Sequence, residues 1–454
     1  MHVRYLASLA VATASAAASP AVAFAADDRF VNKALGVDNA TCAAATPCLT
    51  INHAVSVAGA ADTIHIGPGF YDEAVIADDR MHFEGAGAGD PTSLFTPGTT
   101  RIQPLTDDGP AIELRDGGTV RDLQLVGKAN PSPTNRPGLL LTTAGGGGSE
   151  AFVVENVNAF GGEAAAGTRR EGIRIDDDGT GREMTASLQN LTVTAGATDD
   201  GSDGLVADGP NVTANLEHAT IRALSDKVRF ALWSQHGAEL DLTETTMAQG
   251  GQVVTAIFID DAPGQAVIDR SDLRANGKLL HVLNGVAGQS QALVTDSVLA
   301  TVSDAPTDPA PNPAIQVENT AGGNARIALR GVTVLSRRPK PRALAIFGSG
   351  PGDATASVVN TLLRATSTTG ESAPDVYALA NNGLAGFDAS HSNFSEAVAD
   401  PPLGAGSISV TAPGTAGNLD GDPGFVNEAG GNLRLGAGSQ LVDRGALIMG
   451  TRST

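Results

Sequence analysis

The sequence predicts an all-β chain wound as a parallel β-helix, a solenoid of roughly ten or more coils with a short capping helix at its N-terminal end. Three observations predict this fold. A six-residue pattern recurs along the chain, a second and more apolar strand follows it in each period, and the 3.6-residue apolar stripes of helices are almost absent.

The recurring pattern is apolar, polar, turn-former, any residue, polar, apolar. Between residues 216 and 299 it returns every 26 residues, which indicates coils stacked in register. One position should therefore form an inward stack, and the next position should face solvent. The pattern begins at residues 120, 154, 188, 216, 242, 268, 294, 329, 358 and 389. The predicted inward stacks are Leu216, Leu242, Ile268 and Val294, and Ile221, Met247, Leu273 and Leu299; the predicted outward row is Glu217, Thr243, Asp269 and Thr295.

The second strand of each period is short and apolar, as in GIRI (172–175), GLVA (204–207) and AIFI (256–259). Gly, Asn and Asp turns separate these strands. A helical solenoid of similar period would need long apolar stripes, and the strands of a sandwich would not keep a fixed spacing over so many turns. A parallel β-helix meets both conditions.

The N-terminal residues 1–25 are typical of a secretory signal. A weakly basic start precedes an Ala-rich apolar run, and small residues precede a cut after Ala25. The alternative, a membrane anchor, is disfavoured because the run is too short to span a bilayer, and no later run of 18 apolar residues occurs. We expect a secreted, extracellular protein without a membrane span.

The next segment, residues 26–48, contains both cysteines of the chain. Cys42 and Cys48 are six residues apart, and an oxidising compartment favours a disulfide between them. Zinc binding is the alternative, but two thiolates without a nearby His pair do not make a zinc site.

A capping helix is predicted around residues 49–58, with Leu49, Ile51, Val55 and Val57 facing the first coil. Ile64 and Ile66 should begin the first strand. Residues 49–419 would then form the cap and the coils, and residues 420–454 a C-terminal closing module.

The amino-acid composition excludes some classes of binding partner and disfavours others. The net charge of −21 argues against nucleic acid and against docking on anionic lipid. Only 4% of residues are aromatic, so platforms for sugars are few, and Trp233 lies in an apolar strand where core filling is expected.

At both ends the sequence resembles a known group. "PCLTINHAVSVAGAADTIHIGPGFYDEAVI" is similar to the entry segment of secreted bacterial right-handed parallel β-helix proteins of the pectin-lyase-like superfamily. "DGDPGFVNEAGGNLRLGAGSQLVDRGA" (420–446) resembles their closing module. The resemblance implies a right-handed helix. It implies no single activity, because the superfamily includes lyases, hydrolases, epimerases and adhesins.

Pectate lyases of this superfamily carry an Arg-x-Pro-x-x-Arg motif, in which an arginine removes the proton α to a uronate carboxyl. "SRRPKPRA" contains this string at Arg337, Pro339 and Arg342, although the partner motif around Trp, Asp and His is absent. The alternative is an exposed basic loop between two strands. Asp260 and Asp261 offer an acid–base pair for hydrolysis, and solvated turn aspartates are the alternative there.

Acidic residues follow the second strand in several coils. Stacked at about 4.8 Å, these turns would form a column of carboxylates, which repel one another unless a hard cation such as calcium binds among them. A solvated acidic ridge is the alternative. The predicted calcium ligands are Asp176, Asp177, Asp208, Asp260 and Asp261.

The sequence therefore predicts a secreted β-helix scaffold that offers a polar flank to extracellular polysaccharide or a cell-envelope partner, without turnover. The alternative is a polysaccharide lyase or glycoside hydrolase that acts on uronate-containing glycans through the Arg337–Arg342 segment or the acidic turns.

Overall fold

The computed structural model describes residues 27–442. Within that span it leaves out residues 92, 94–95, 107–108, 128–136, 144–148, 162–169, 180, 196–201, 224–227, 249–252, 261–263, 302–311, 372 and 403.

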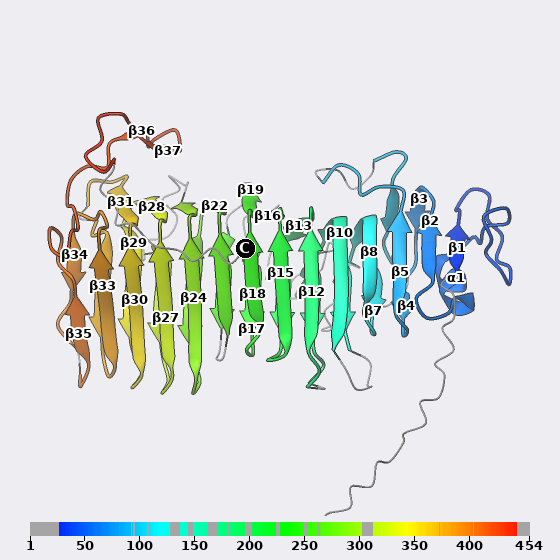
Figure 1. Cartoon of the computed structure of the whole chain (residues 1–454), viewed down its shortest axis with the longest axis horizontal. Helices are drawn as coiled ribbons and strands as arrows, with labels where there is room; N and C mark the ends of the chain where they lie inside the picture. Colours follow the sequence, from blue (N-terminus) through cyan, green and yellow to red (C-terminus); the bar gives the residue numbers. More distant parts are fainter. Residues whose placement is uncertain are drawn as a thin grey trace, which may run out of the picture.

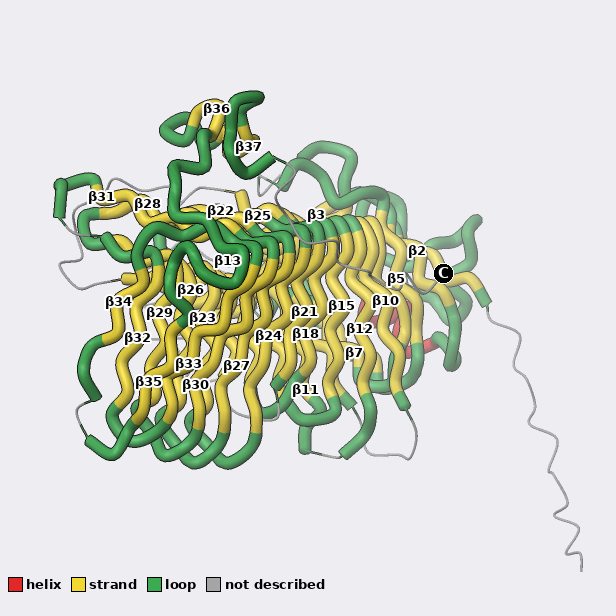
Figure 2. The backbone as a smooth tube through the Cα atoms, turned by 60° about the vertical axis from the view of Figure 1, so that its left-hand side comes forward, coloured by secondary structure: helices red, strands yellow, loops and turns green. Residues whose placement is uncertain are grey.

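The described residues form a right-handed parallel β-helix, as the sequence predicted. Strands of successive coils lie side by side along the long axis (Figure 1), and the view in Figure 2 shows the coils stacked on one another. A 23-stranded sheet, here called the large sheet, and a 12-stranded sheet, the small sheet, enclose the core.

The large sheet contains two rows of strands because most coils bend once within it. The first row is β1 (Asp28–Val31), β2 (Thr63–Ile66), β5 (Met81–Gly85), β8 (Gly118–Val126), β10 (Glu150–Phe160), β12 (Met184–Gln189), β15 (Val212–Glu217), β18 (Glu239–Thr243), β21 (Gln265–Asp269), β24 (Gln289–Thr295), β27 (Asn324–Arg330), β30 (Asp353–Val359), β33 (Leu384–Ser390) and β35 (Ser407–Val410). The second row is β3 (Gly69–Tyr71), β6 (Thr100–Ile102), β13 (Thr192–Ala195), β16 (Thr220–Ala223), β19 (Thr246–Ala248), β22 (Asp272–Ala275), β25 (Val298–Thr301), β28 (Thr333–Arg338) and β31 (Leu362–Ser367).

The small sheet has one strand per coil. Its strands are β4 (Val75–Ala77), β7 (Ile112–Leu114), β9 (Leu139–Thr142), β11 (Arg170–Asp176), β14 (Ser202–Asp208), β17 (Val228–Gln235), β20 (Val253–Asp260), β23 (Lys278–Asn284), β26 (Asn312–Asn319), β29 (Pro341–Gly348), β32 (Val376–Ala380) and β34 (Ala397–Ala399).

The recurring pattern of the sequence is the bend between the two rows. Its turn-forming residue has a positive φ in coil after coil, for example 49° at Asn190, 54° at His218 and 47° at Arg270. Asn and Asp tolerate this left-handed conformation, and Gly331 adopts it without strain. One left-handed residue turns the chain from the first row to the second.

The predicted inward stack is confirmed. Leu216, Leu242, Ile268 and Val294 are register partners on successive strands, and each is at most 1% exposed. Beside them, hydroxyl groups stack inside the bend. The backbone N–H of Thr245 donates to Ser271 Oγ at 3.1 Å, and that of Ser271 donates to Ser297 Oγ at 3.0 Å. These hydroxyl groups thereby satisfy two buried N–H groups of the bend.

The described residues contain one helix, α1 (Ile51–Val57), which covers the N-terminal end of the coils. The free N–H groups at the start of the helix have side-chain acceptors. The Glu73 carboxylate accepts from Ile51 at 3.1 Å and from Asn52 at 2.8 Å, and the Thr50 hydroxyl accepts from His53. Burial raises the pKa of Glu73. No helix among the described residues has the length and apolarity that crossing a membrane requires.

Two details of the predicted cap were wrong. Leu49 precedes the helix and is 36% exposed, whereas Ile51 and Ala54 are buried. The first strand is β1, not the strand of Ile64 and Ile66, because residues before the helix pair with β2. The disulfide between Cys42 and Cys48 is present and buried under this cap, which confirms the predicted pairing.

Near the C-terminus, the antiparallel hairpin β36 (Phe425–Asn427) and β37 (Asn432–Leu435) lies over a flank of the helix, above β28 and β31 in Figure 1. The Arg337 guanidinium donates to the Ala429 carbonyl at 3.3 Å, and the Thr366 hydroxyl donates to Glu428 at 2.7 Å. These contacts hold part of the predicted closing module against the coils.

Candidate functional site

The structure separates the two arginines of the lyase-like string. Arg337 belongs to β28 in the large sheet, and Arg342 belongs to β29 in the small sheet. Pro339 and Lys340 connect these two strands. The guanidinium carbon of Arg342 lies 3.4 Å from the ring centre of Tyr377. The segment is therefore two strands with a tight connection rather than the exposed loop that was the alternative.

Arg337 lines a groove of about 650 Å³ together with Thr366, Thr369 and Glu428. Arg342 is not among the residues that line it. The geometry thus provides a polar groove beside Arg337 but does not bring the two arginines to one side of a substrate.

The acidic turns of the small sheet do lie on one flank, as predicted. Asp176 and Asp208 are register partners at the ends of β11 and β14, and Asp260 ends β20 two strands further on. Gln235, on the intervening strand β17, is the register partner of Asp208. Asp261 lies outside the described residues.

Arg174 provides the positive charge in this column. Its guanidinium lies 3.1 Å from Glu171 and 2.9 Å from Asp176, and it also pairs with Asp208. Burial alone would lower the pKa of Arg174, but the three carboxylates raise it above its usual value. A fixed guanidinium thus relieves the repulsion for which the sequence analysis proposed calcium.

Asp208 and Asp177 have further protein partners. Asp208 accepts from the Gln235 amide at 2.6 Å, and His236 Nδ1 lies 2.6 Å from its other oxygen. Asp177 is 3% exposed and accepts from the Gly179 N–H at 2.9 Å and from the Asn211 amide at 3.1 Å. Calcium binding here remains a proposal that chelation can test.

Among the described residues, the side chains close enough together to share a metal ion are Cys42, Cys48 and His53. Both sulfurs belong to the disulfide, so they are not thiolate ligands.

Trp233 does not fill the central core, contrary to the prediction. Its neighbours Leu232 and Ser234 point inward, whereas Trp233 packs on the outer face of the small sheet against Phe258 and Phe230. The Arg229 guanidinium carbon lies 4.6 Å from the Trp233 ring centre. These rings form a closed outer layer, since Trp233 is only 6% exposed.

Beyond the rings, the same outer row continues into a titratable cluster. His281 pairs in register with Phe258, and Lys278 Nζ lies 3.4 Å from His281 Nδ1. Glu318, on the next strand, lies 3.4 Å from His281 Nε2 and accepts from the Gln316 amide at 2.7 Å. We call Lys278, His281 and Glu318 the amine–imidazole cluster.

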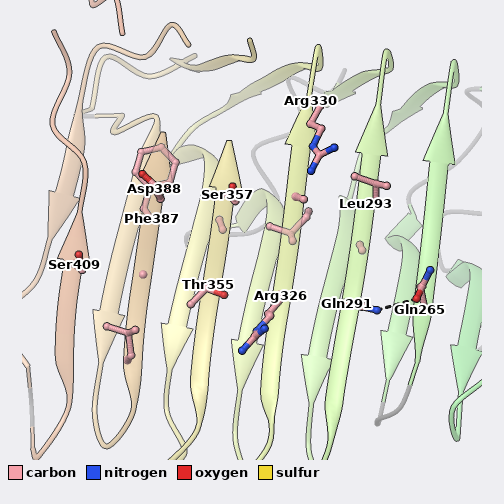
Figure 3. Close-up of a pocket in the computed structure, with 16 residues that line it drawn as sticks. Gln265, Gln291, Leu293, Arg326, Arg330, Thr355, Ser357, Phe387, Asp388 and Ser409 are labelled. Atoms are coloured by element: carbon pink, nitrogen blue, oxygen red, sulfur yellow. Dashed lines mark hydrogen bonds between the residues drawn. The ribbon is translucent and has the colours of Figure 1, made fainter. Parts of the chain in front are cut away.

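A groove of about 540 Å³ crosses the outer face of the large sheet near its C-terminal end. It runs across β21, β24, β27, β30, β33 and β35 (Figure 3), a path of roughly 24 Å at the usual strand spacing. Its polar lining consists of Gln265, Gln291, Arg326, Arg330, Thr355, Ser357, Asp388 and Ser409.

Small side chains make room for this groove. Ala328, Ser357 and Gly386 lie at outward positions of three successive strands. Because these side chains are small, they leave space above the sheet between the larger polar side chains on either side. Arg326 and Arg330 are exposed on β27, and among the described residues neither has an acidic partner within 4 Å. In a chain with a net charge of −21, two unpaired guanidinium groups at one groove favour an anionic or strongly polar ligand.

Neither the groove nor the amine–imidazole cluster was predicted from the sequence. The groove residues come from six coils between positions 265 and 409, so no local motif links them. The cluster had a weak signal, because Lys278 and His281 interrupt an otherwise apolar strand.

Neither a protein-family model nor a curated protein sequence matches the chain. A mutant of DFA-IIIase from Arthrobacter chlorophenolicus A6 in complex with DFA-III is similar in structure, with a TM-score of 0.46 and 11% identity over 80% of this chain and 87% of that one. XylC in complex with xylose has a TM-score of 0.37 and 9% identity over 88% of this chain and 87% of that one.

Proposed function

We propose that the protein is a secreted β-helix that binds an extended extracellular or cell-envelope polysaccharide along the groove of the large sheet, without chemical turnover. The groove itself supports this proposal most directly. It presents amide, hydroxyl and guanidinium groups from β21, β24, β27, β30 and β35, and the carboxylate of Asp388 from β33, along the helix axis.

The groove matches an extended glycan in form. Outward side chains of consecutive strands repeat at about 4.8 Å, so a polymer of ring-shaped units can meet polar groups from several coils. Arg326 and Arg330 can each donate paired hydrogen bonds to a carboxylate or sulfate on the chain, while Gln265 and Gln291 offer amides to neutral hydroxyl groups.

Binding without turnover is supported by the arrangement of the arginines. Arg337 donates to a backbone carbonyl and Arg342 lies on Tyr377, so the pair does not form the base-and-partner arrangement that a lyase would need. Export is supported by the signal-like N-terminus and by the disulfide, which is typical of proteins in oxidising compartments.

The test uses immobilised glycans, both uronate-containing and neutral, with binding measured by biolayer interferometry. Ser357→Trp fills the floor of the groove and should abolish binding. Ser187→Trp is the matched control, because Ser187 lies in the same outward row six strands away. Arg326→Ala should weaken binding to an acidic glycan by about tenfold or more, from the loss of a charge-assisted hydrogen bond.

Two results would reject the proposal: equal binding by the two tryptophan variants, or no binding to any glycan of the panel. Release of unsaturated or reducing ends from the same glycans would show turnover and favour the lyase or hydrolase alternative. Mass spectrometry of the exported protein should place its first residue at position 26.

A further inference from the structure

The amine–imidazole cluster has the geometry of an activated nucleophile. Lys278 Nζ and His281 Nδ1 are 3.4 Å apart, and His281 Nε2 and Glu318 Oε2 are also 3.4 Å apart. An amine, an imidazole and a carboxylate follow one another in the order found in triads, and the Nε2–Oε2 contact is an ion-pair distance without hydrogen-bond geometry. None of the three residues lines the groove of the large sheet.

The proton positions in this cluster follow from its neighbours. A carboxylate beside Nε2 favours the imidazole tautomer with its proton on Nε2, which leaves the lone pair of Nδ1 facing Lys278. Burial lowers the pKa of His281, so the ring is neutral near pH 7. The contact with His281 lowers the pKa of Glu318 despite its burial, so that carboxyl group is ionised.

The surroundings favour a neutral amine at Lys278. Burial lowers its pKa to about 8, with the nearby Arg338 acting in the same direction and Glu318 opposing it. The Phe258 ring lies 5.0 Å from the His281 ring and adds an apolar wall. Lys278 is partly exposed and the Glu318 side chain is 23% exposed, so the cluster reaches the protein surface.

We propose that Lys278 is a nucleophilic amine that captures a small aldehyde or the open-chain form of a reducing sugar as an imine, with His281 as proton acceptor. The amine nitrogen attacks the carbonyl carbon, a C–N bond forms, and the carbonyl π electrons move to the oxygen. His281 Nδ1 takes a proton from the attached nitrogen and passes it to the oxygen, which gives a carbinolamine. A second proton follows the same route, the nitrogen lone pair forms the C=N bond, the C–O bond breaks and water leaves. Hydrolysis reverses the sequence, and no oxidant or reductant takes part.

The test is reductive trapping on the full-length protein. Glyceraldehyde and sodium cyanoborohydride at pH 7.5 convert an imine into a stable secondary amine, and peptide mass spectrometry then measures the labelling rate of each lysine. Lys33 and Lys340 are exposed internal standards. At pH 7.5 about a quarter of an amine with a pKa of about 8 is neutral, against roughly 0.1% of an ordinary lysine, so Lys278 should react at least about tenfold faster.

His281→Gln separates a reactive amine from a merely buried one. It should slow labelling of Lys278 several-fold and change the pH profile of that labelling, while Lys33 and Lys340 react as before. Glu318→Gln should act in the same direction, and it serves instead if His281→Gln does not fold. Labelling of Lys278 no faster than that of Lys340, or a rate and pH profile unchanged by either variant, would overturn the proposal.

Discussion

Truncating Ile268 to alanine tests the register of the coils. Ile268 is fully buried, with Leu242 and Val294 as its register partners on the two neighbouring strands. The change deletes three carbon groups, which contribute about 0.8 kcal/mol each when buried, or about 2.4 kcal/mol together. If the neighbours do not relax, a cavity of up to roughly 80 Å³ at about 24 cal/mol per Å³ adds about 2 kcal/mol. We expect a loss of about 2 to 4 kcal/mol.

The matched control is Val267→Ala on the same strand. Val267 points outward and is partly exposed, so its truncation should cost well under 1 kcal/mol. Guanidinium unfolding measures both free energies. Hydrogen exchange should show faster opening at β18 and β24 than at β5 or β33, because each coil contacts only its neighbours. Equal losses at positions 267 and 268 would refute the register.

Four further expectations can be measured. Alkylation without reductant should leave Cys42 and Cys48 unmodified, and replacing both with serine should lower the free energy of unfolding by about 2 kcal/mol, the value for such a short closed loop. Arg174→Met removes an ion-pair partner of the fully buried Glu171 and should lower the free energy of chemical unfolding by about 3 kcal/mol. If Arg174 suffices for the acidic column, calcium chelation should leave Tm unchanged; a fall of several degrees would support a calcium site instead. Because folding lowers the pKa of Lys278 from 10.5 to about 8, the unfolded state binds more protons between these values, so stability should rise with pH across this window in the wild type relative to Lys278→Met.

The coils themselves could be predicted because their signal is local and repeated. Each six-residue pattern contains an inward residue, an outward residue and a left-handed turn residue, and these three requirements act within a few residues of one another. The spacing between His218 and Glu244, for instance, already states that they occupy the same bend in successive coils, where both have positive φ. The cysteine pair was predictable for the same reason.

The candidate sites were less predictable because they depend on what lies one or two coils away. Arg174 forms ion pairs with the carboxylates at positions 176 and 208, and no spacing in the sequence indicated this contact. Trp233 looked like a core residue because it sits in an apolar run, but the pleat turned it outward against Phe258.

By itself, the sequence determined the architecture: a parallel β-helix with a helical N-terminal cap, a disulfide and in-register aliphatic stacks. These features follow from side-chain periodicity and turn chemistry, which are properties of the chain taken a few residues at a time. Only the tertiary structure decided the sites. In the folded protein, six strands far apart in the sequence line one groove, Arg337 and Arg342 lie on different sheets, and Glu318 lies next to His281 and near Lys278. The physical reason is that stacking at about 4.8 Å makes neighbours of residues some 26 to 40 positions apart, so the chemistry of each face depends on coil lengths that vary along the chain.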